Sequence, residues 1–346
     1  MQEKNKTRTS PVNPSSSTLH TRCFRHPRVD QIERELKYLI YPGSQTSVPM
    51  ICGPTGTGKS TLARRIVETE NEQAADQMEA NPGLLPAVYV EAPNSGENEF
   101  SWRLLYERIL DALGDHLDTP RSVYGIDPES SRMVRPYGAG RNNLASLRTA
   151  VERGLRARWV RFLVIDEAAQ IIRHAHSRGR LQAQLDTLKS LANECGTQIV
   201  LVGAYDLYPL VSLSGQLARR IHVLHFERYR VDVPEDLEAF ATCVRAFERA
   251  LPELWDGKLM RHTDALHHNT LGCIGTLSGV LTRAAHYAET TGKWDDSALK
   301  RALLSEAQRL PILSEINDGE AAIGPSQTRV WEPRRRTEST RPRSAA

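Results

Sequence analysis

One short stretch, Gly53-Pro54-Thr55-Gly56-Thr57-Gly58-Lys59-Ser60, constrains the fold more than any other part of the chain. Its glycines let backbone N–H groups approach a phosphate closely, and a helix that begins at Lys-Ser adds the positive end of its dipole. A loop of this kind connects a buried parallel strand to a helix. The stretch therefore predicts a nucleotide-binding α/β fold.

The residues on both sides of this loop have the character that such a fold requires. Residues 48–52 are short and apolar, as in a buried parallel strand, and residues 60–67 have helical periodicity. We expect Lys59 to reach the β- and γ-phosphates of ATP and the Ser60 hydroxyl to ligate Mg²⁺. The expected ATP-binding residues are Gly53, Pro54, Thr55, Gly56, Thr57, Gly58, Lys59, Ser60 and Thr61.

An acidic pair follows a second apolar stretch. Residues 162–165 are apolar, and Asp166 and Glu167 come directly after them. Ligands of open parallel sheets lie at the carboxyl ends of the strands, so both carboxylates are expected beside the phosphates. Asp166 would hold magnesium through water, and Glu167 would orient and deprotonate the attacking water. The alternative is a strand that ends in ordinary surface acids, but a pair favours hydrolysis over transfer to a substrate.

Two further stretches complete the predicted sheet. Residues 86–92 and 198–203 are apolar enough to be strands, and leucines recur at helical spacing between the acidic pair and the later stretch. Alternation of strands and helices is typical of a doubly wound α/β fold.

The composition is that of an ordinary globular protein. Charged residues make up 25% of the chain and hydrophobic residues 40%. No apolar run approaches the roughly 20 residues that a membrane helix needs, and the N-terminus lacks a signal-peptide pattern. The five cysteines are scattered without a Cys-x-x-Cys pair, which favours reduced thiols. These features predict a cytoplasmic protein with no membrane partner.

Both ends of the chain are basic. Residues 1–28 carry six Lys or Arg against one Glu, and residues 329–346 carry six Arg against two Glu. Such Pro- and Ser-rich ends favour flexible arms that contact an anionic surface or a partner. Solvated tails without any partner are an equal alternative.

The order of these motifs resembles that of the AAA+ ATPases and, more narrowly, that of the transposition regulators of the TniB/TnsC group. The resemblance runs from about residue 48 to about residue 290. Its most diagnostic segments are LANE at 191–194, VLVG at 200–203 and QLARR at 216–220, beside residues 86–93 and 104–114. The resemblance implies an AAA+ P-loop NTPase fold, in which helices flank a parallel sheet and a small C-terminal helical lid follows.

On this resemblance the chain divides into four parts. They are a basic, flexible arm (1–28), an α/β nucleotide-binding domain (29–230), a helical lid (231–310) and a basic, mostly disordered tail (311–346). Residues 231–236 are interpreted as a linker before the first lid helix.

The QLARR segment carries an arginine that is expected to act between subunits. In AAA+ rings an arginine near this position reaches the nucleotide of the next subunit and neutralises transition-state charge. Arg220 aligns best with that arginine, and Arg219 is the alternate. The other interpretation is a solvated basic pair at a helix end.

Two positions depart from the family pattern. The family has a small hydroxyl residue after the Val-Gly of the sensor strand, where this chain has Ala204; Tyr205 and Asp206 are the nearby substitutes. A second-sensor arginine is missing directly after Gly275, and Arg283 lies two helical turns later. Both departures leave nucleotide binding intact and predict slow turnover.

An arginine-rich segment lies before the acidic pair. Residues 121–161 contain nine arginines, three acids and no lysine. Arginine pairs bidentately with phosphate, so the segment predicts a sequence-neutral surface for duplex DNA. The alternative for each arginine is a helix-face salt bridge or a subunit contact. The expected DNA-binding residues are Arg103, Arg121, Arg132, Arg135, Arg141 and Arg148.

The resemblance implies an ATP-dependent oligomer, a ring or a helical filament on double-stranded DNA. It would bridge a target-selection protein and a transposase, and ATP hydrolysis would dismantle it. It would not cut or join DNA itself. A replication initiator or helicase loader, and a signalling NTPase that does not bind DNA, are the alternatives.

Overall fold

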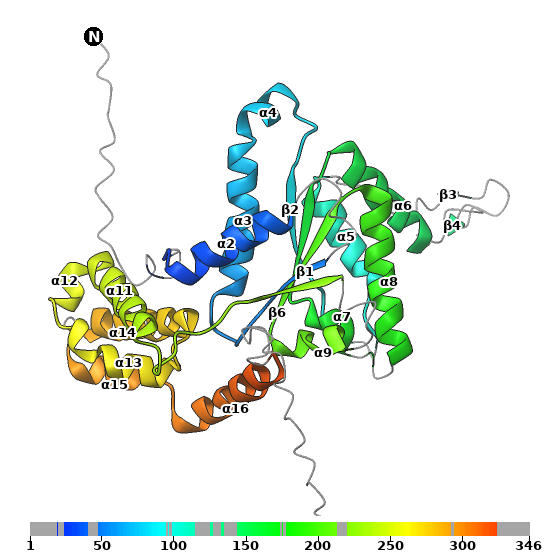
Figure 1. Ribbon diagram of the computed structural model, residues 1–346. Helices are drawn as coiled ribbons and strands as arrows, with labels where there is room; N and C mark the ends of the chain where they lie inside the picture. The colour runs from blue at the N-terminus through cyan, green and yellow to red at the C-terminus, as the bar shows by residue number, and fades with distance from the viewer. Residues whose placement is uncertain are drawn as a thin grey trace, which may run out of the picture.

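A five-stranded parallel sheet lies at the centre of the computed structural model, between two layers of helices (Figure 1). The structure describes residues 19, 24–40, 48–94, 96, 99–114, 125–126, 133–134, 144–173, 175, 178–212, 220–291 and 294–323. The strand order is β2-β5-β6-β1-β7, and every neighbouring pair is parallel. The strands are β1 (Val48–Cys52), β2 (Ala87–Glu91), β5 (Phe162–Asp166), β6 (Gln198–Gly203) and β7 (Ile221–His225).

The three inner strands are buried along their whole length, as their continuous apolar runs predict. Alternate side chains of each strand enter different cores. Ile165 of β5 lies in the core beneath α5 (Trp102–Ala112), α6 (Leu144–Ala157) and α8 (Arg178–Cys195). Val164 lies in the core beneath α2 (Pro27–Leu39) and α3 (Lys59–Gln73) on the other face. The predicted α/β class and its four predicted strands are confirmed.

The register of the sheet brings the predicted motifs to one edge. Cys52, the last residue of β1, pairs with Gly203 of β6, and Ile165 of β5 pairs with Leu201 of β6. The phosphate loop after β1, the acidic pair that ends β5 and Ala204 after β6 therefore lie at the same carboxyl edge.

A helical domain follows β7 and has a core of its own. Its centre includes Phe240, Phe247, Trp255 and Leu281, all buried. Leu19 is buried in the same core, and the Phe24 ring lies 3.9 Å from the Phe247 ring. Its helices are α11 (Pro234–Ala250), α12 (Pro252–Trp255), η3 (Met260–His262), α13 (Thr263–Thr270), α14 (Ile274–Thr291) and α15 (Asp296–Ala302).

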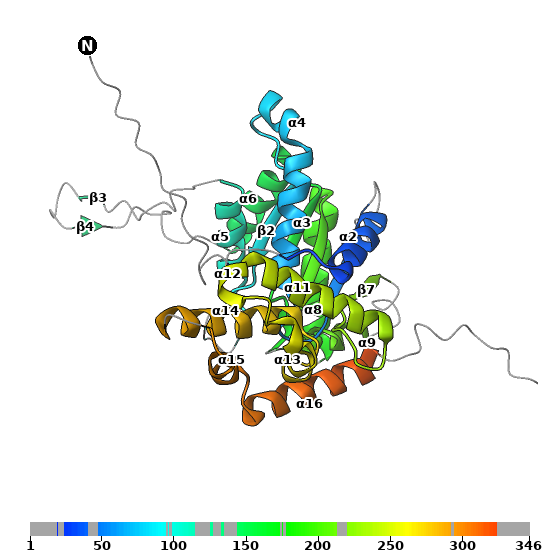
Figure 2. The ribbon, with the colours of Figure 1, turned by 90° about the vertical axis from the view of Figure 1, so that its left-hand side faces the viewer.

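Helix α16 (Glu306–Ile323) leaves this domain and runs back beneath the sheet, as the orange-red ribbon shows in two views (Figures 1 and 2). Residues 311–323 thus form a helix, which corrects the tail boundary predicted at residue 311. The composition of residues 311–346 as a whole concealed this helix, because the residues after 323 are mostly polar. Within the helix Ile316 and Ile323 are buried, whereas Leu310 is 55% exposed. Residues 324–346, like residues 1–18 and 20–23 of the N-terminal arm, lie outside the described part of the chain.

Smaller differences concern element boundaries. Helix α11 begins at Pro234, so the last three residues of the predicted linker 231–236 are already helical; proline suits the first position of a helix because it has no N–H to satisfy. Strand β7 was not predicted. The short elements are α4 (Ala75–Ala80), α7 (Ala169–Arg173), η2 (Tyr205–Leu207), α9 (Pro209–Ser212) and the antiparallel pair β3 (Gly125–Ile126) and β4 (Met133–Val134). No helix in the described ranges has the length and apolar character needed to cross a membrane.

Candidate nucleotide site

The phosphate loop adopts the conformation that its glycines predict. Gly56 and Gly58 have φ angles of 83° and 100°, a left-handed region that other residues rarely enter. Gly58 directly precedes α3 and offers no side chain to cap the helix. The first-turn N–H groups of α3 therefore face the loop, which fits a bound phosphate group.

The loop is clamped by backbone contacts from other segments. A Cβ on Gly53 would lie 2.2 Å from the carbonyl oxygen of Phe226 after β7. The backbone N–H of Thr276 in α14 donates a 2.9 Å hydrogen bond to the Gly56 carbonyl. A Cβ on Gly275 would lie only 2.7 Å from that same carbonyl oxygen. The predicted lid segment thus packs directly on the phosphate loop.

The Lys59 side chain folds back onto the phosphate loop. Its Nζ donates to the carbonyl oxygens of Gly53 at 2.9 Å and of Pro54 at 2.7 Å. Burial lowers the pKa of the amine, and the nearby carboxylates of Glu167, Glu315 and Asp166 oppose that shift. The side chain is therefore held across the loop, where it can add a positive charge to bound phosphates.

The two carboxylates of the acidic pair lie in different surroundings. Asp166 is buried; its Oδ2 accepts from the Tyr89 hydroxyl at 2.9 Å and its Oδ1 from the backbone N–H of Glu167 at 2.8 Å. Glu167 has a φ of 50°, a strained conformation for a non-glycine residue, and its side chain lines the cavity. Partial burial, followed by the charge of Asp166, raises the pKa of the Glu167 carboxyl, which favours it as a proton acceptor.

These groups surround a cavity of about 540 Å³. It is lined by Thr55, Gly56, Gly58, Lys59, Ser60, Glu167, Arg173, Ala204, Asp206, Gly275 and Glu315. The phosphate loop and the carboxyl edge of the sheet form one wall, which we call the α/β wall. Gly275 of α14 and Glu315 of α16 form the opposite wall, the helical wall.

A small hollow of about 70 Å³ shares Gly58 and Gly275 with this cavity. Phe24, His26 and Val29 line it from the N-terminal segment, and Ile274 and Ser278 from α14. His26 Nδ1 lies 2.9 Å from the Tyr229 hydroxyl, and burial lowers its pKa to about 4, so the ring is neutral at neutral pH. Aromatic and apolar groups beside a phosphate cradle fit a flat, neutral nucleobase.

Only two of the predicted sensor positions line the cavity. Ala204 and Asp206 both line the cavity, and Asp206 lies 3.4 Å from Arg173. The Tyr205 hydroxyl instead meets His225 Nε2 at 2.8 Å. Arg283 donates to the carbonyl of Ala302 at 2.9 Å, so it joins α14 to α15.

Of the two predicted intersubunit arginines, the described one, Arg220, does not line this cavity. Arg220 is exposed and its carbonyl accepts from the Val48 N–H at 2.7 Å, at the amino edge of the sheet. This is the edge opposite the phosphate loop. Arg219 lies outside the described residues.

Of the six arginines expected to bind DNA, only Arg103 and Arg148 lie in the described part of the chain. Arg148 donates to Glu152 at 2.8 Å and to the Ser190 hydroxyl at 2.6 Å, so it braces α6 against α8. Arg103 is 53% exposed and pairs with Glu107 one turn along α5. The salt-bridge alternative therefore describes Arg148 well, and Arg103 keeps more of its surface. Arg121, Arg132, Arg135 and Arg141 are among the residues that the structure does not describe.

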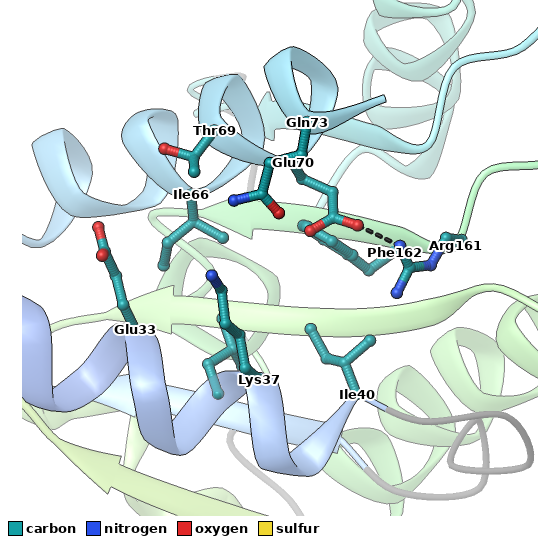
Figure 3. A pocket seen from close by; sticks show the side chains of 10 residues that line it. Glu33, Lys37, Ile40, Ile66, Thr69, Glu70, Gln73, Arg161 and Phe162 are labelled. Atoms are coloured by element: carbon teal, nitrogen blue, oxygen red, sulfur yellow. Dashed lines mark hydrogen bonds and ion pairs between the residues drawn. The ribbon is translucent and has the colours of Figure 1, made fainter. Parts of the chain in front are cut away.

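A separate hollow of about 270 Å³ lies between α2 and α3 (Figure 3). Figure 3 shows Glu70 of α3 joined to Arg161, which directly precedes β5. Ile40, Ile66 and Phe162 form an apolar floor under this charged rim. No residue of the phosphate loop or acidic pair lines it, so it is distinct from the nucleotide cavity.

Three groups of residues in the site were missed by the sequence analysis. Glu315 lies 260 positions after Thr55 and accepts a 2.9 Å hydrogen bond from the Thr55 hydroxyl. No local sequence pattern links the two residues. Arg173 and the segment around His26 are likewise brought in by the fold. Periodic apolar residues in 312–323 were the one available signal, since they would have placed a helix in the assumed tail.

The oxygen ligands predicted for magnesium are compatible with that ion. Ser60 lines the cavity, and Asp166 presents a carboxylate at the end of β5, directly beside it. Hydroxyl and carboxylate oxygens are the ligand types that Mg²⁺ prefers, and phosphates usually complete its shell.

A glycine-rich loop after β1, an acidic pair ending β5 and a helical lid on the loop together define an AAA+ P-loop ATPase fold. Comparisons with known proteins agree, since residues 43–211 match a family model described as an AAA domain. No curated protein sequence matches this chain.

The fold is shared with solved structures, among them the following two. The ORC2 protein of Aeropyrum pernix, solved in ADPNP-ADP complexes, superposes with a TM-score of 0.55 and 16% sequence identity, over 83% of this chain and 72% of that chain. A Walker-type ATPase of Pyrococcus abyssi gives a TM-score of 0.51 and 15% identity, over 90% and 78%. At these identities the similarity shows the fold alone. The narrower resemblance to the TniB/TnsC group stays a prediction.

Proposed function

We propose that this protein binds and hydrolyses ATP and uses the nucleotide to control its assembly on DNA. The observation that carries the proposal is the cavity at the carboxyl edge, where Lys59, Ser60 and Glu167 line one wall. A phosphate cradle and a carboxylate with a raised pKa in one cavity are the two parts that hydrolysis requires.

In the proposed reaction, the α3 N-terminus and Lys59 bind the phosphates of ATP. Ser60 and Asp166 would hold magnesium, which supplies charge neutralisation at the phosphates. Glu167 orients a water molecule and accepts its proton, while the Tyr89 hydroxyl and the Glu167 N–H fix the Asp166 carboxylate. The hollow beside His26, about 70 Å³ in volume, would receive only an edge of the base. Ala204 adds no hydrogen bond to the γ-phosphate, so we expect turnover to be slow.

The position of Arg220 supports oligomerisation. This residue lies at the amino edge of the sheet, opposite its own cavity, so it is available to a neighbouring subunit. We infer that it completes the nucleotide site of the next copy in a ring or filament.

Complementation between variants tests this intersubunit role. Lys59→Ala lacks a working cradle but keeps Arg220, and Arg220→Ala keeps the cradle. Each alone should hydrolyse ATP at least tenfold more slowly than wild type, and an equal mixture should recover activity because mixed interfaces contain one intact site. Activity in the mixture equal to the mean of the two variants would contradict an intersubunit role.

Duplex DNA is proposed as the surface on which assembly occurs. The support is the basic balance of residues 121–161 and of both chain ends, with Arg103 as the exposed described member. Arg103→Ala should weaken binding about threefold to tenfold and flatten its salt dependence. Arg108→Ala is the matched control, because Arg108 lies on the same helix and donates to the Glu91 carbonyl at 2.7 Å. Equal losses in both variants would remove Arg103 from the DNA surface.

The context that we propose is DNA transposition, in which the assembly bridges a target-selection protein and a transposase. Support comes from the LANE, VLVG and QLARR segments, which resemble those of the TniB/TnsC group. The fold similarity to the ORC2 protein does not favour replication initiation over this role.

Electron microscopy of the protein with linear duplex DNA tests the assembly step. We expect rings or filaments with a slowly hydrolysed ATP analogue, and free particles with ADP or without nucleotide. Free particles in all three conditions would contradict nucleotide-controlled assembly and favour a signalling NTPase.

A further inference from the structure

Helix α16 places an acidic residue at the phosphate end of the cavity. The Glu315 Oε1 atom accepts a 2.9 Å hydrogen bond from the Thr55 hydroxyl of the phosphate loop. Glu315 lines the cavity together with Lys59 and Ser60. A carboxylate in this position stands where negative phosphate groups are expected.

Specific contacts hold α16 in this place. Ile316 is fully buried against Leu271 and Cys273, which precede α14. Gly319 packs flat on the Tyr205 ring, where a Cβ would lie 2.0 Å from a ring carbon. One face of the helix is therefore fitted to the junction between the lid and the sheet.

The second half of α16 is anchored by charge and by the main core. Arg228, which follows β7, donates to both carboxylate oxygens of Glu320, at 2.8 and 3.2 Å. Ile323 is buried in the core of the α/β domain. The helix thus bridges the two domains across the carboxyl edge of the sheet (Figures 1 and 2). Glu315 lies near the midpoint of its residues 306–323.

The charges around the phosphate end are unbalanced. Glu167, Asp206 and Glu315 line the cavity against two basic residues, Lys59 and Arg173. Asp206 is already near Arg173, and Lys59 serves the phosphate loop. Glu315 hydrogen-bonds the neutral Thr55 hydroxyl and shares the charge of Lys59 with Glu167 and Asp166, so its own negative charge would act on any additional phosphate.

We propose that Glu315 discriminates ATP from ADP, because its carboxylate opposes the γ-phosphate, and that α16 is displaced when the triphosphate binds. With ADP the Thr55–Glu315 hydrogen bond is retained and α16 stays on the cavity. With ATP the helix moves off the junction formed by Leu271, Cys273 and Tyr205. This inference rests on the proposed nucleotide binding.

Equilibrium binding of fluorescent nucleotides gives the first test. Glu315→Gln keeps the shape and removes the charge, so it should bind a slowly hydrolysed ATP analogue about tenfold more tightly than wild type. Its affinity for ADP should stay within about twofold of the wild-type value. Asp318→Asn is the matched control, since it removes one exposed charge from the same helix without lining the cavity, and it should change neither affinity.

Hydrogen exchange of residues 306–323 gives a second readout that does not depend on turnover. In the wild-type chain, exchange of this segment should be faster with the ATP analogue than with ADP. Glu315→Gln should reduce that difference, because the displacing repulsion is gone. Identical exchange with both nucleotides would contradict displacement of α16.

Three binding results would overturn the discrimination role. Equal changes in ATP and ADP affinity would show that the carboxylate does not act on the γ-phosphate. No change in either affinity would show that it does not act on the nucleotide. Weaker binding of the analogue only in the presence of Mg²⁺ would show that Glu315 helps hold the metal. Failure of the wild-type chain to bind any nucleotide would reject the proposed function as well.

Discussion

The two walls of the nucleotide cavity differ in the distance along the chain from which they are assembled. The α/β wall takes most of its chemistry from one contiguous loop and one pair of adjacent acids, at 53–60 and 166–167. The helical wall takes single residues, Gly275 from α14 and Glu315 from α16, from two helices after the sheet. A contiguous motif keeps its geometry wherever it occurs, whereas the helical wall exists only when the lid is packed on the sheet. We therefore expect substitutions in the α/β wall to change ATP binding and hydrolysis. Substitutions in the helical wall should change how the lid packs on the phosphate loop.

The largest effect is expected from Glu167→Gln in the α/β wall. Loss of the proton acceptor should lower ATP turnover by about 10²- to 10⁴-fold, while ATP affinity stays near the wild-type value. Steady-state hydrolysis and equilibrium binding would be measured on the same preparation. Asp186→Asn, an exposed acid of α8 outside the cavity, is the control. Unchanged turnover in Glu167→Gln would remove this residue from the role of base.

Removal of Lys59 should act on binding instead. Lys59→Ala deletes the buried amine between the loop and the phosphates, and charge-assisted hydrogen bonds contribute about 1.5–3 kcal/mol each. We expect ATP affinity to fall by about 100-fold, with ATP-dependent assembly lost. Calorimetric titration gives the affinity, and Lys189→Ala on α8 is the control. Wild-type affinity in Lys59→Ala would show that the nucleotide lies elsewhere.

Substitutions at two glycines of α14 test the helical wall independently of the α/β wall. Gly275→Ala would place a Cβ 2.7 Å from the Gly56 carbonyl oxygen, so the lid must shift from the phosphate loop. Overpacking of this kind costs about 1–3 kcal/mol, and the melting temperature should fall by several degrees. Gly279→Ala is the control on the same helix, because its Cβ would meet only Arg283 Nη1 at 3.7 Å. Helix propensity should leave that variant equally or more stable.

The glycine comparison also tests the division between the walls. Turnover per bound nucleotide should change less in Gly275→Ala than in Glu167→Gln, because the acidic pair remains in place. A loss of turnover as large as that of Glu167→Gln would show that the helical wall takes part in the chemical step.

The smallest expected effect is a displaced pH profile. A proton acceptor must be ionised, and the pKa of Glu167 is raised by burial and by Asp166. Turnover at saturating ATP should therefore begin to fall, as the pH decreases, above the ordinary glutamate value of about 4.3. A profile that stays flat down to that value would contradict the raised pKa.

The same shift has a consequence for stability with the opposite sign from the usual carboxylate. The folded state disfavours the Glu167 charge, so this group destabilises the fold at neutral pH and ceases to do so below its unfolded pKa. Glu167→Gln should melt at a slightly higher temperature than wild type at pH 7. The difference in melting temperature should disappear in acid, where Glu167 is protonated and is as neutral as the glutamine. Thermal melts at several pH values measure it.

The sequence by itself determined the parts of the molecule whose physics is local. A glycine-rich loop with Lys-Ser, buried strands without alternation and an acidic pair each follow from steric freedom or burial within a few residues. For that reason the predicted strands are confirmed, and Lys59 and Glu167 line one cavity at the carboxyl edge of the sheet; their roles stay predictions. Residues 312–323 also carry apolar residues at helical spacing, but over 311–346 as a whole polar residues outnumber them.

Tertiary structure decided which distant residues line the nucleotide cavity and which arginines are bound by side chains of the same chain. Glu315 reaches Thr55 only because α16 packs against Leu271, Tyr205 and the main core. Arg148 is bound by Glu152 and Ser190, while the equally basic Arg103 stays more than half exposed. Such outcomes depend on the relative placement of whole helices, which is set by the sum of many weak packing contacts. No spacing in the sequence encodes that sum, so the place of Glu315 in the helical wall could be found only in the folded molecule.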